Sequence, residues 1–171
     1  PVGVMEPTRH LKLEGAYNVR DLGGYPTVDG RTTRWRTFLR ADSLHRLSPA
    51  SQTALLDLGI RSVVDLRRKA EGEELPNVFA SSPDVTYHNY SLAGDTLAID
   101  PEAWQAESLD SLEPSDQIAW SYSRLLDRQQ AKFGQTLATL ADPATPPAIY
   151  HCAGGKHRTG LISALLLAIA G

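Results

Sequence analysis

Apolar residues are grouped along the chain as expected for alternating helices and strands. Residues 60–66, IRSVVDL, contain two adjacent β-branched valines and predict a buried strand. The leucines of residues 49–58 predict the apolar face of a helix, with Ser48 as its N-cap and Pro49 at its first position. Gly59 is expected to end that helix. A helix, a glycine turn and a buried strand in direct succession are typical of an α/β fold.

The same pattern predicts elements on both sides of this unit. Short strands are expected at residues 35–39, 85–90 and 148–150, and a final apolar helix is expected to begin near Thr159. Residues 92–113 are rich in turn formers and acids and predict a long loop, with a short helix near its middle.

From Ser115 onward, apolar residues recur at helical spacing and predict one long helix. The side chains of this stripe are expected to belong to the core: Ile118, Tyr122, Leu125, Leu126, Phe133, Leu137 and Leu140.

Length and composition fit one domain of an ordinary globular protein. The chain has 171 residues, of which 42% are hydrophobic and 22% are charged, and residues 1–14 are expected to form an N-terminal arm. A formal charge of −3 argues against a general nucleic-acid binder, although a local basic pocket for an anionic substrate is still allowed. The single cysteine excludes an intrachain disulfide.

The N-terminal residues and the length of the longest apolar run bear on the cellular location of the protein. The first residues lack the basic region and apolar run of a signal peptide, and the longest apolar run, residues 161–170, is shorter than a membrane span. We therefore expect no transmembrane segment and a cytoplasmic location, with secretion by another route left open. The sequence predicts no oligomeric state.

The segment from His151 to Gly160, HCAGGKHRTG, lies between the last predicted strand and the last helix. Gly154 and Gly155 would let the backbone curl its N–H groups around a phosphate. The helix that follows directs its partially positive N-terminus into the same loop, and this field favours the thiolate form of Cys152.

These residues suit the hydrolysis of a phosphate monoester. The thiolate of Cys152 would attack phosphorus, Arg158 would bind two phosphate oxygens through its planar guanidinium, and water would hydrolyse the phosphocysteine. The remaining contacts to phosphate or to the leaving sulfur are expected from Ala153, Gly154, Gly155, Lys156 and Thr159.

Other interpretations of the loop have less support. Lys156 is followed by His157 rather than by serine or threonine, so the loop does not match a Walker motif. A metal site of His151, Cys152 and His157 would lack standard ligand spacing. A phosphate-binding module without turnover is the second hypothesis for function.

The motif C-x5-R, flanked by His and by Thr-Gly, resembles the signature of protein tyrosine and dual-specificity phosphatases. Residues 18–25, NVRDLGGY, are similar to the N-[FLV]-R-D-[LV]-G-G stretch of bacterial tyrosine/serine phosphatases of the secreted mycobacterial and listerial type. Residues 39–44 and 58–67 match the same family in the same order. The resemblance covers residues 17–92 and 148–171.

The resemblance implies an α/β fold of the dual-specificity type, with a central, mostly parallel sheet flanked by helices and no metal or organic cofactor. It also implies that Asp65 and Arg67 lie close to the phosphate loop, and we predict a catalytic role for Asp65. Asp21 and Arg20 are expected to hold the N-terminal turn, while Arg40 could serve the turn or the loop.

The chain departs from the family at two places. The family loop reads G-K-D-R, with aspartate as general acid, and His157 stands at that position here. Imidazole suits proton donation near neutral pH, so we predict that His157 is the general acid, with Asp95 as the alternative. Family chains continue through several more helices, so this chain is expected to be a fragment or to need another part to complete the fold.

The resemblance implies phosphorylated substrates of more than one class. Phosphotyrosine, phosphoserine and phosphothreonine proteins are expected from the family. Lys156 in C-x-x-G-K-x-R also resembles the tensin-type lipid phosphatases, which adds phosphoinositides as a candidate class.

Overall fold

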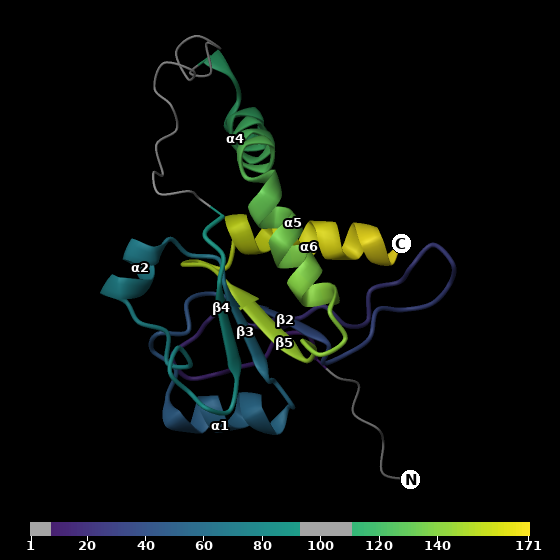
Figure 1. Cartoon of the computed structure of the whole chain (residues 1–171). Coiled ribbons are helices and arrows are strands. Elements are labelled where there is room, and N and C mark those ends of the chain that lie inside the picture. Colours follow the sequence, from purple (N-terminus) through teal and green to yellow (C-terminus); the bar gives the residue numbers. More distant parts are fainter. Residues whose placement is uncertain (1–7, 93–110) are drawn as a thin grey trace.

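The computed structural model describes residues 8–92 and 111–171 (Figure 1). Within these ranges the chain forms a five-stranded sheet in the order β1-β2-β5-β3-β4. β1 pairs antiparallel with β2, and the other pairs are parallel. The predicted α/β fold with a mostly parallel sheet is therefore confirmed. The strands are β1 (Arg20–Asp21), β2 (Phe38–Ala41), β3 (Ser62–Asp65), β4 (Thr86–Asn89) and β5 (Ala148–His151).

Helices cover both faces of the sheet, with α1 on one side and α5 and α6 on the other, while α4 extends away from the sheet (Figure 1). The helices are α1 (Pro49–Asp57), α2 (Lys69–Glu74), α4 (Pro114–Arg128), α5 (Gln130–Ala141) and α6 (His157–Ala170). No described helix is long and apolar enough to cross a membrane.

Alternation along the strands divides the core into two clusters. Val63 and its neighbours pack with Leu55 of α1, whereas Val64 packs with Phe133 of α5 and Ile162 of α6. Successive side chains of a strand point to opposite faces, so a strand buried on both sides reads as a continuous apolar run.

The start and end of α1 agree with the sequence. The Ser48 hydroxyl accepts a hydrogen bond from the N–H of Ser51 at 3.3 Å, and Pro49 is the first helical residue. Gly59 follows the helix with φ of 88°, a left-handed conformation that costs glycine little.

One long core helix from Ser115 to about residue 140 was a wrong prediction. Gln129 separates α4 from α5, and α4 contains no buried residue. Ile118 on its apolar stripe is 47% exposed, while Leu125 and Leu126 near its end are partly buried against the core. Phe133 and Leu140 of α5 are buried as expected. Helical spacing of apolar residues shows that a helix has an apolar face. It does not show whether another element covers that face, and burial requires such a cover. The predicted short helix of the preceding loop, at Trp104, lies outside the described residues.

The N-terminal segment is paired with the sheet in its described part. Leu11 donates its N–H to the Val19 carbonyl at 3.0 Å, and Asp21 donates to the Arg9 carbonyl at 2.8 Å. The strand expected at residues 35–39 begins later, at Phe38.

The position of Trp35 explains this shift. A Cβ on Gly23 would lie 2.5 Å from the Trp35 Cα, and one on Gly24 would lie 2.4 Å from the indole ring. The two glycines thus let the N-terminal turn pack directly on Trp35. Arg36, the next residue, has φ of 56°, which is not an extended conformation and keeps the strand from starting before it.

The last turns of α6 leave apolar surface open. Ile169 is 73% exposed, and an apolar groove of about 340 Å³ lies between α5, α6 and the segment around Thr37. That additional chain completes the fold stays a prediction.

The parallel strands bring four segments to one edge of the sheet. Ala41, His151, Asp65 and Asn89 are aligned at the carboxyl ends of β2, β5, β3 and β4. Crevices beyond the carboxyl ends of parallel strands are where α/β proteins bind ligands.

Candidate active site

The loop that follows β5 lies at this edge. Cys152 is buried at 3% exposure, whereas Ala153, Gly154 and Lys156 are exposed. α6 begins at His157, directly after Lys156, so its N-terminus adjoins the loop as predicted.

The two loop glycines differ in what they contribute. Gly155 has φ of 64°, while Gly154 does not have a positive φ. A Cβ on Gly155 would lie 2.6 Å from the Asp42 nitrogen and 2.7 Å from the Ala41 carbonyl oxygen, whereas a Cβ on Gly154 would meet nothing within 4 Å. The conformational freedom of glycine is therefore required at Gly155. That both glycines let the loop curl around a phosphate stays a prediction.

Arg158 is held by a carboxylate from another element. Its Nη1 and Nη2 donate to the two carboxylate oxygens of Glu71 in α2, at 2.7 and 2.9 Å. The same carboxylate accepts the N–H of Arg68 at 2.9 Å, at the start of α2. The hydrogen bond from Arg158 is the largest cause that lowers the pKa of Glu71 to about 2.

This arrangement leaves one edge of the Arg158 guanidinium for a ligand. Nη1 also donates to the Leu66 carbonyl at 3.3 Å. Of the five N–H donors of arginine, three are thus bound to Glu71 and Leu66, and within the described ranges Nε–H and the second Nη2–H have no partner. These two donors are parallel, which is the geometry that binds two oxygens of one phosphate.

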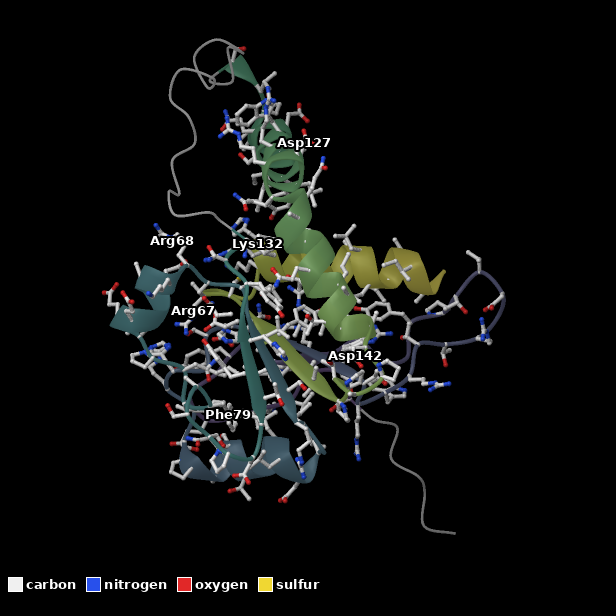
Figure 2. The ribbon with its side chains drawn as sticks, viewed as in Figure 1. Arg67, Arg68, Phe79, Asp127, Lys132 and Asp142 are labelled. Atoms are coloured by element: carbon white, nitrogen blue, oxygen red, sulfur yellow. The ribbon has the colours of Figure 1, made fainter. Side chains whose placement is uncertain are left out.

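Asp65 lies in a buried network beneath the loop. Its carboxylate accepts Nε and Nη2 of Arg67, the latter at 2.7 Å, and the Tyr87 hydroxyl at 2.8 Å. Burial alone would raise the pKa of Asp65, but the neighbouring His151 and the hydrogen bonds from Arg67 lower it overall. Figure 2 shows Arg67 between the sheet and α2, in the interior.

Arg67 connects this network to the phosphate loop. Its Nη1 donates to the Ser43 hydroxyl at 3.1 Å, and the Ser43 N–H donates to the Ala153 carbonyl at 2.9 Å. The structure thus brings Asp65 and Arg67 next to the loop from below. Among the described residues, Asp65 also approaches the loop through His151, whose Nε2 lies 3.4 Å from its carboxylate.

His151 is fully buried between the Asp65 network and the loop. The Asn77 amide oxygen accepts the N–H of Phe79 at 2.9 Å, so its NH₂ group faces His151 and donates to Nε2 at 2.7 Å. Nδ1 then carries the hydrogen and donates to the Cys152 carbonyl at 3.2 Å. Burial lowers the pKa of His151, which agrees with a neutral imidazole.

Both imidazole nitrogens of His151 are therefore occupied by hydrogen bonds. In the part of the chain that the structure describes, no group of three His, Cys, Asp or Glu side chains is placed to hold a metal ion.

His157 lies at the exposed start of α6, and its Nδ1 is 2.7 Å from the Tyr122 hydroxyl of α4. Thr159 is buried, and its hydroxyl donates to the Ala41 carbonyl at 3.5 Å, the long limit of a hydrogen bond. Asp95, the alternative acid, lies outside the described residues.

Sequence reasoning missed Glu71 and Tyr122. The only local signal for Glu71 was its spacing of three from Arg68, which suits a helix-capping carboxylate but says nothing about Arg158. Tyr122 was assigned to an apolar stripe, where its hydroxyl carried no separate signal.

Sequence similarity to known proteins extends over nearly the whole chain. The profile of the tyrosine phosphatase family matches residues 11–171. A tyrosine-protein phosphatase of Nostoc commune is 33% identical over 134 residues, which are 78% of this chain and 43% of that protein. A candidate tyrosine-protein phosphatase of Cupriavidus necator is 27% identical over 100% of this chain and 62% of its own length. The chain therefore spans less than two thirds of either relative.

Proposed function

Because the chain belongs to the tyrosine phosphatase family, we propose that it hydrolyses phosphate monoesters through Cys152, with phosphotyrosine proteins as its first substrate class. The observation that carries this proposal is the pairing of Arg158 with Glu71. Glu71 fixes two of its donors, so that the parallel pair at its other edge is held ready for two phosphate oxygens.

The reaction proceeds in two balanced steps. The Cys152 thiolate attacks phosphorus, a sulfur–phosphorus bond forms, and the ester oxygen leaves with the electron pair of the broken bond and takes a proton. Water then attacks the phosphocysteine, releases inorganic phosphate and returns the thiolate. Arg158 and the N–H groups of residues 153–156 stabilise the charge that develops on the phosphoryl oxygens.

Asp65 acts at a distance from the phosphate. Its carboxylate is occupied by Arg67 and Tyr87, so it orients Arg67 and, through Ser43, the Ala153 end of the loop. This role differs from a proton donor, which needs a free oxygen near the leaving group.

The proposal is tested by measuring phosphate release from a phosphotyrosine peptide, a phosphoserine peptide and a short-chain phosphoinositide. We expect turnover of the phosphotyrosine peptide and inhibition by tungstate. Hydrolysis of the phosphoinositide at a higher kcat/KM would favour a lipid substrate, which the exposed side chains of Lys156 and His157 could contact. Tungstate binding with no turnover of any substrate would support the phosphate-binding module instead.

Glu71→Gln is expected to lower kcat/KM by about tenfold, because the guanidinium loses a charged hydrogen-bond partner that fixes its orientation. The glutamine keeps the shape of the side chain and can accept only through one oxygen. Glu73→Gln is the matched control, since Glu73 is 67% exposed on the same helix and pairs with Lys69 at 3.7 Å. Equal activity in both variants would contradict a positioning role for Glu71.

The same pair sets a pH dependence of stability. The pKa of Glu71 is lowered from 4.5 to about 2, so its contribution is complete above about pH 4.5 and is lost as the pH falls toward 2. Glu71→Gln should therefore be less stable than the wild type at pH 7, and the difference should shrink below pH 4.5. Urea denaturation of both proteins at pH 7 and at several values below pH 4.5 measures this difference in stability.

His157→Ala is expected to reduce kcat at least about tenfold more on an alkyl phosphate than on a phenyl phosphate, because a general acid matters most for a poor leaving group. Tyr122→Phe removes only the hydroxyl at Nδ1 and should show a smaller loss in the same direction. Equal, small losses on both substrates would make His157 a rim residue and move the acid to Asp95.

A further inference from the structure

Three carbonyl groups of the phosphate loop accept hydrogen bonds from residues that do not belong to the loop. The Ala153 carbonyl accepts the N–H of Ser43 at 2.9 Å. The Asn18 amide donates to the Gly154 carbonyl at 3.2 Å and to the Gly155 carbonyl at 3.0 Å. These donors come from the N-terminal motif and from the segment after β2, far from the loop in sequence.

A second donor reaches the same loop from the sheet. Nη2 of Arg40, in β2, donates to the Gly155 carbonyl at 2.6 Å. Arg40 lies opposite Tyr150 of β5, two positions before Cys152, so its side chain starts from the strand beside the loop.

We propose that Asn18 and Arg40 are positioning residues that turn the N–H groups of the phosphate loop toward the bound phosphate. In a planar trans peptide the C=O of one residue and the N–H of the next point in opposite directions. Binding the carbonyls of Gly154 and Gly155 from outside therefore directs the N–H groups of Gly155 and Lys156 inward. This inference rests on the proposed function, because it assigns these N–H groups to phosphate.

Asn18 is itself fixed for this role. Its backbone N–H donates to the Asp42 carboxylate at 2.9 Å, and Nη1 of Arg20 donates to its side-chain oxygen. With the oxygen occupied, the NH₂ group is the end that faces the loop. Arg40 adds a positive charge beside the loop, which favours both a thiolate and a phosphate dianion.

The inference also gives the N-terminal motif two separate tasks. Asp21 accepts the N–H groups of Gly23 and Arg36, at 2.7 and 2.9 Å, and so holds the glycine turn. Asn18 acts on the opposite side, at the phosphate loop. Arg40, for which the sequence left two roles open, belongs to the loop.

The test is calorimetric titration with tungstate of the wild type, Asn18→Ala and Arg40→Met. Each variant is expected to bind tungstate about tenfold more weakly, the scale of one hydrogen bond lost from the site's support. Arg40→Lys keeps one donor and should recover part of the affinity. Iodoacetamide alkylation of Cys152 at pH 7 should be slower in both deletion variants, and tungstate should protect them less.

Arg61→Met is the matched control. Nη1 of Arg61 donates to the carbonyls of Leu56 and Ile60 at the other end of the sheet, at 2.9 and 2.8 Å. This variant is expected to bind tungstate as the wild type does. If Asn18→Ala melts at a much lower temperature than Arg61→Met, Asn18→Leu, which keeps the size, adds no charge and loses the donor, takes its place.

The outcomes separate the two proposals. Folded Asn18 and Arg40 variants whose tungstate affinity and alkylation rate equal those of the wild type would overturn the positioning role. A wild type that binds tungstate but hydrolyses no ester would contradict the proposed function, while weaker binding by the variants would still support the positioning role.

Discussion

Cys152→Ser is expected to abolish hydrolysis, with kcat reduced at least about a thousandfold, the scale on which losing a nucleophile acts. Within the described residues, the neighbouring His151 cannot remove the proton of a serine hydroxyl, because its nitrogens are bound to the Cys152 carbonyl and to Asn77. The backbone of the loop and the free edge of Arg158 are unchanged. Tungstate or phosphate should therefore still bind within a few-fold of the wild-type affinity.

The measurement combines phosphate release with calorimetric titration on the same preparation. Cys152→Ala serves as the control for size, since it removes the sulfur without offering a second nucleophile. Serine turnover near the wild-type rate would exclude the thiolate mechanism. Loss of tungstate binding in both variants would mean that the sulfur, rather than the backbone and Arg158, holds the oxyanion.

The sequence was sufficient for the parts of the site that are local in the chain. Cys152, Arg158 and the start of α6 follow one another within a single loop, so a strand, a glycine pair and a helix start placed them without any tertiary information. The α/β class was equally local in origin, because Gly59 follows the end of α1 and the buried valines mark the next strand. The parallel order of the sheet was expected from the family resemblance.

The contacts that orient these groups could not be predicted in the same way. Glu71 and Arg158 are 87 positions apart, and Asn18 and Gly155 are 137 apart, so neither pair leaves a local pattern. Asp65 was predicted to be catalytic from the family resemblance, which does not reveal that Arg67 and Tyr87 occupy its carboxylate. The position of α4 was missed for a similar reason, since an apolar stripe on a helix does not show which other element, if any, packs against it.

The two loop glycines offer the sharpest structural test, because adjacent, identical residues are expected to respond differently. Gly155→Ala forces a side chain into φ of 64° and against the backbone of Ala41 and Asp42. The conformation alone costs about 1–3 kcal/mol, and the contact with rigid backbone adds to it. Gly154→Ala meets open space at a position without a positive φ, so its effect on stability should be within about 0.5 kcal/mol.

The effect on activity should follow the same order. Moving Gly155 away from β2 displaces its carbonyl from Asn18 and Arg40, and with it the N–H of the next residue. Displacement of about 1 Å in a catalytic constellation can reduce the rate about a hundredfold, so we expect at least that loss in kcat/KM for Gly155→Ala and a much smaller one for Gly154→Ala. Urea denaturation and phosphate release measure both effects. Similar losses in the two variants would show that the loop needs flexibility at both positions, rather than the close approach of Gly155 to β2.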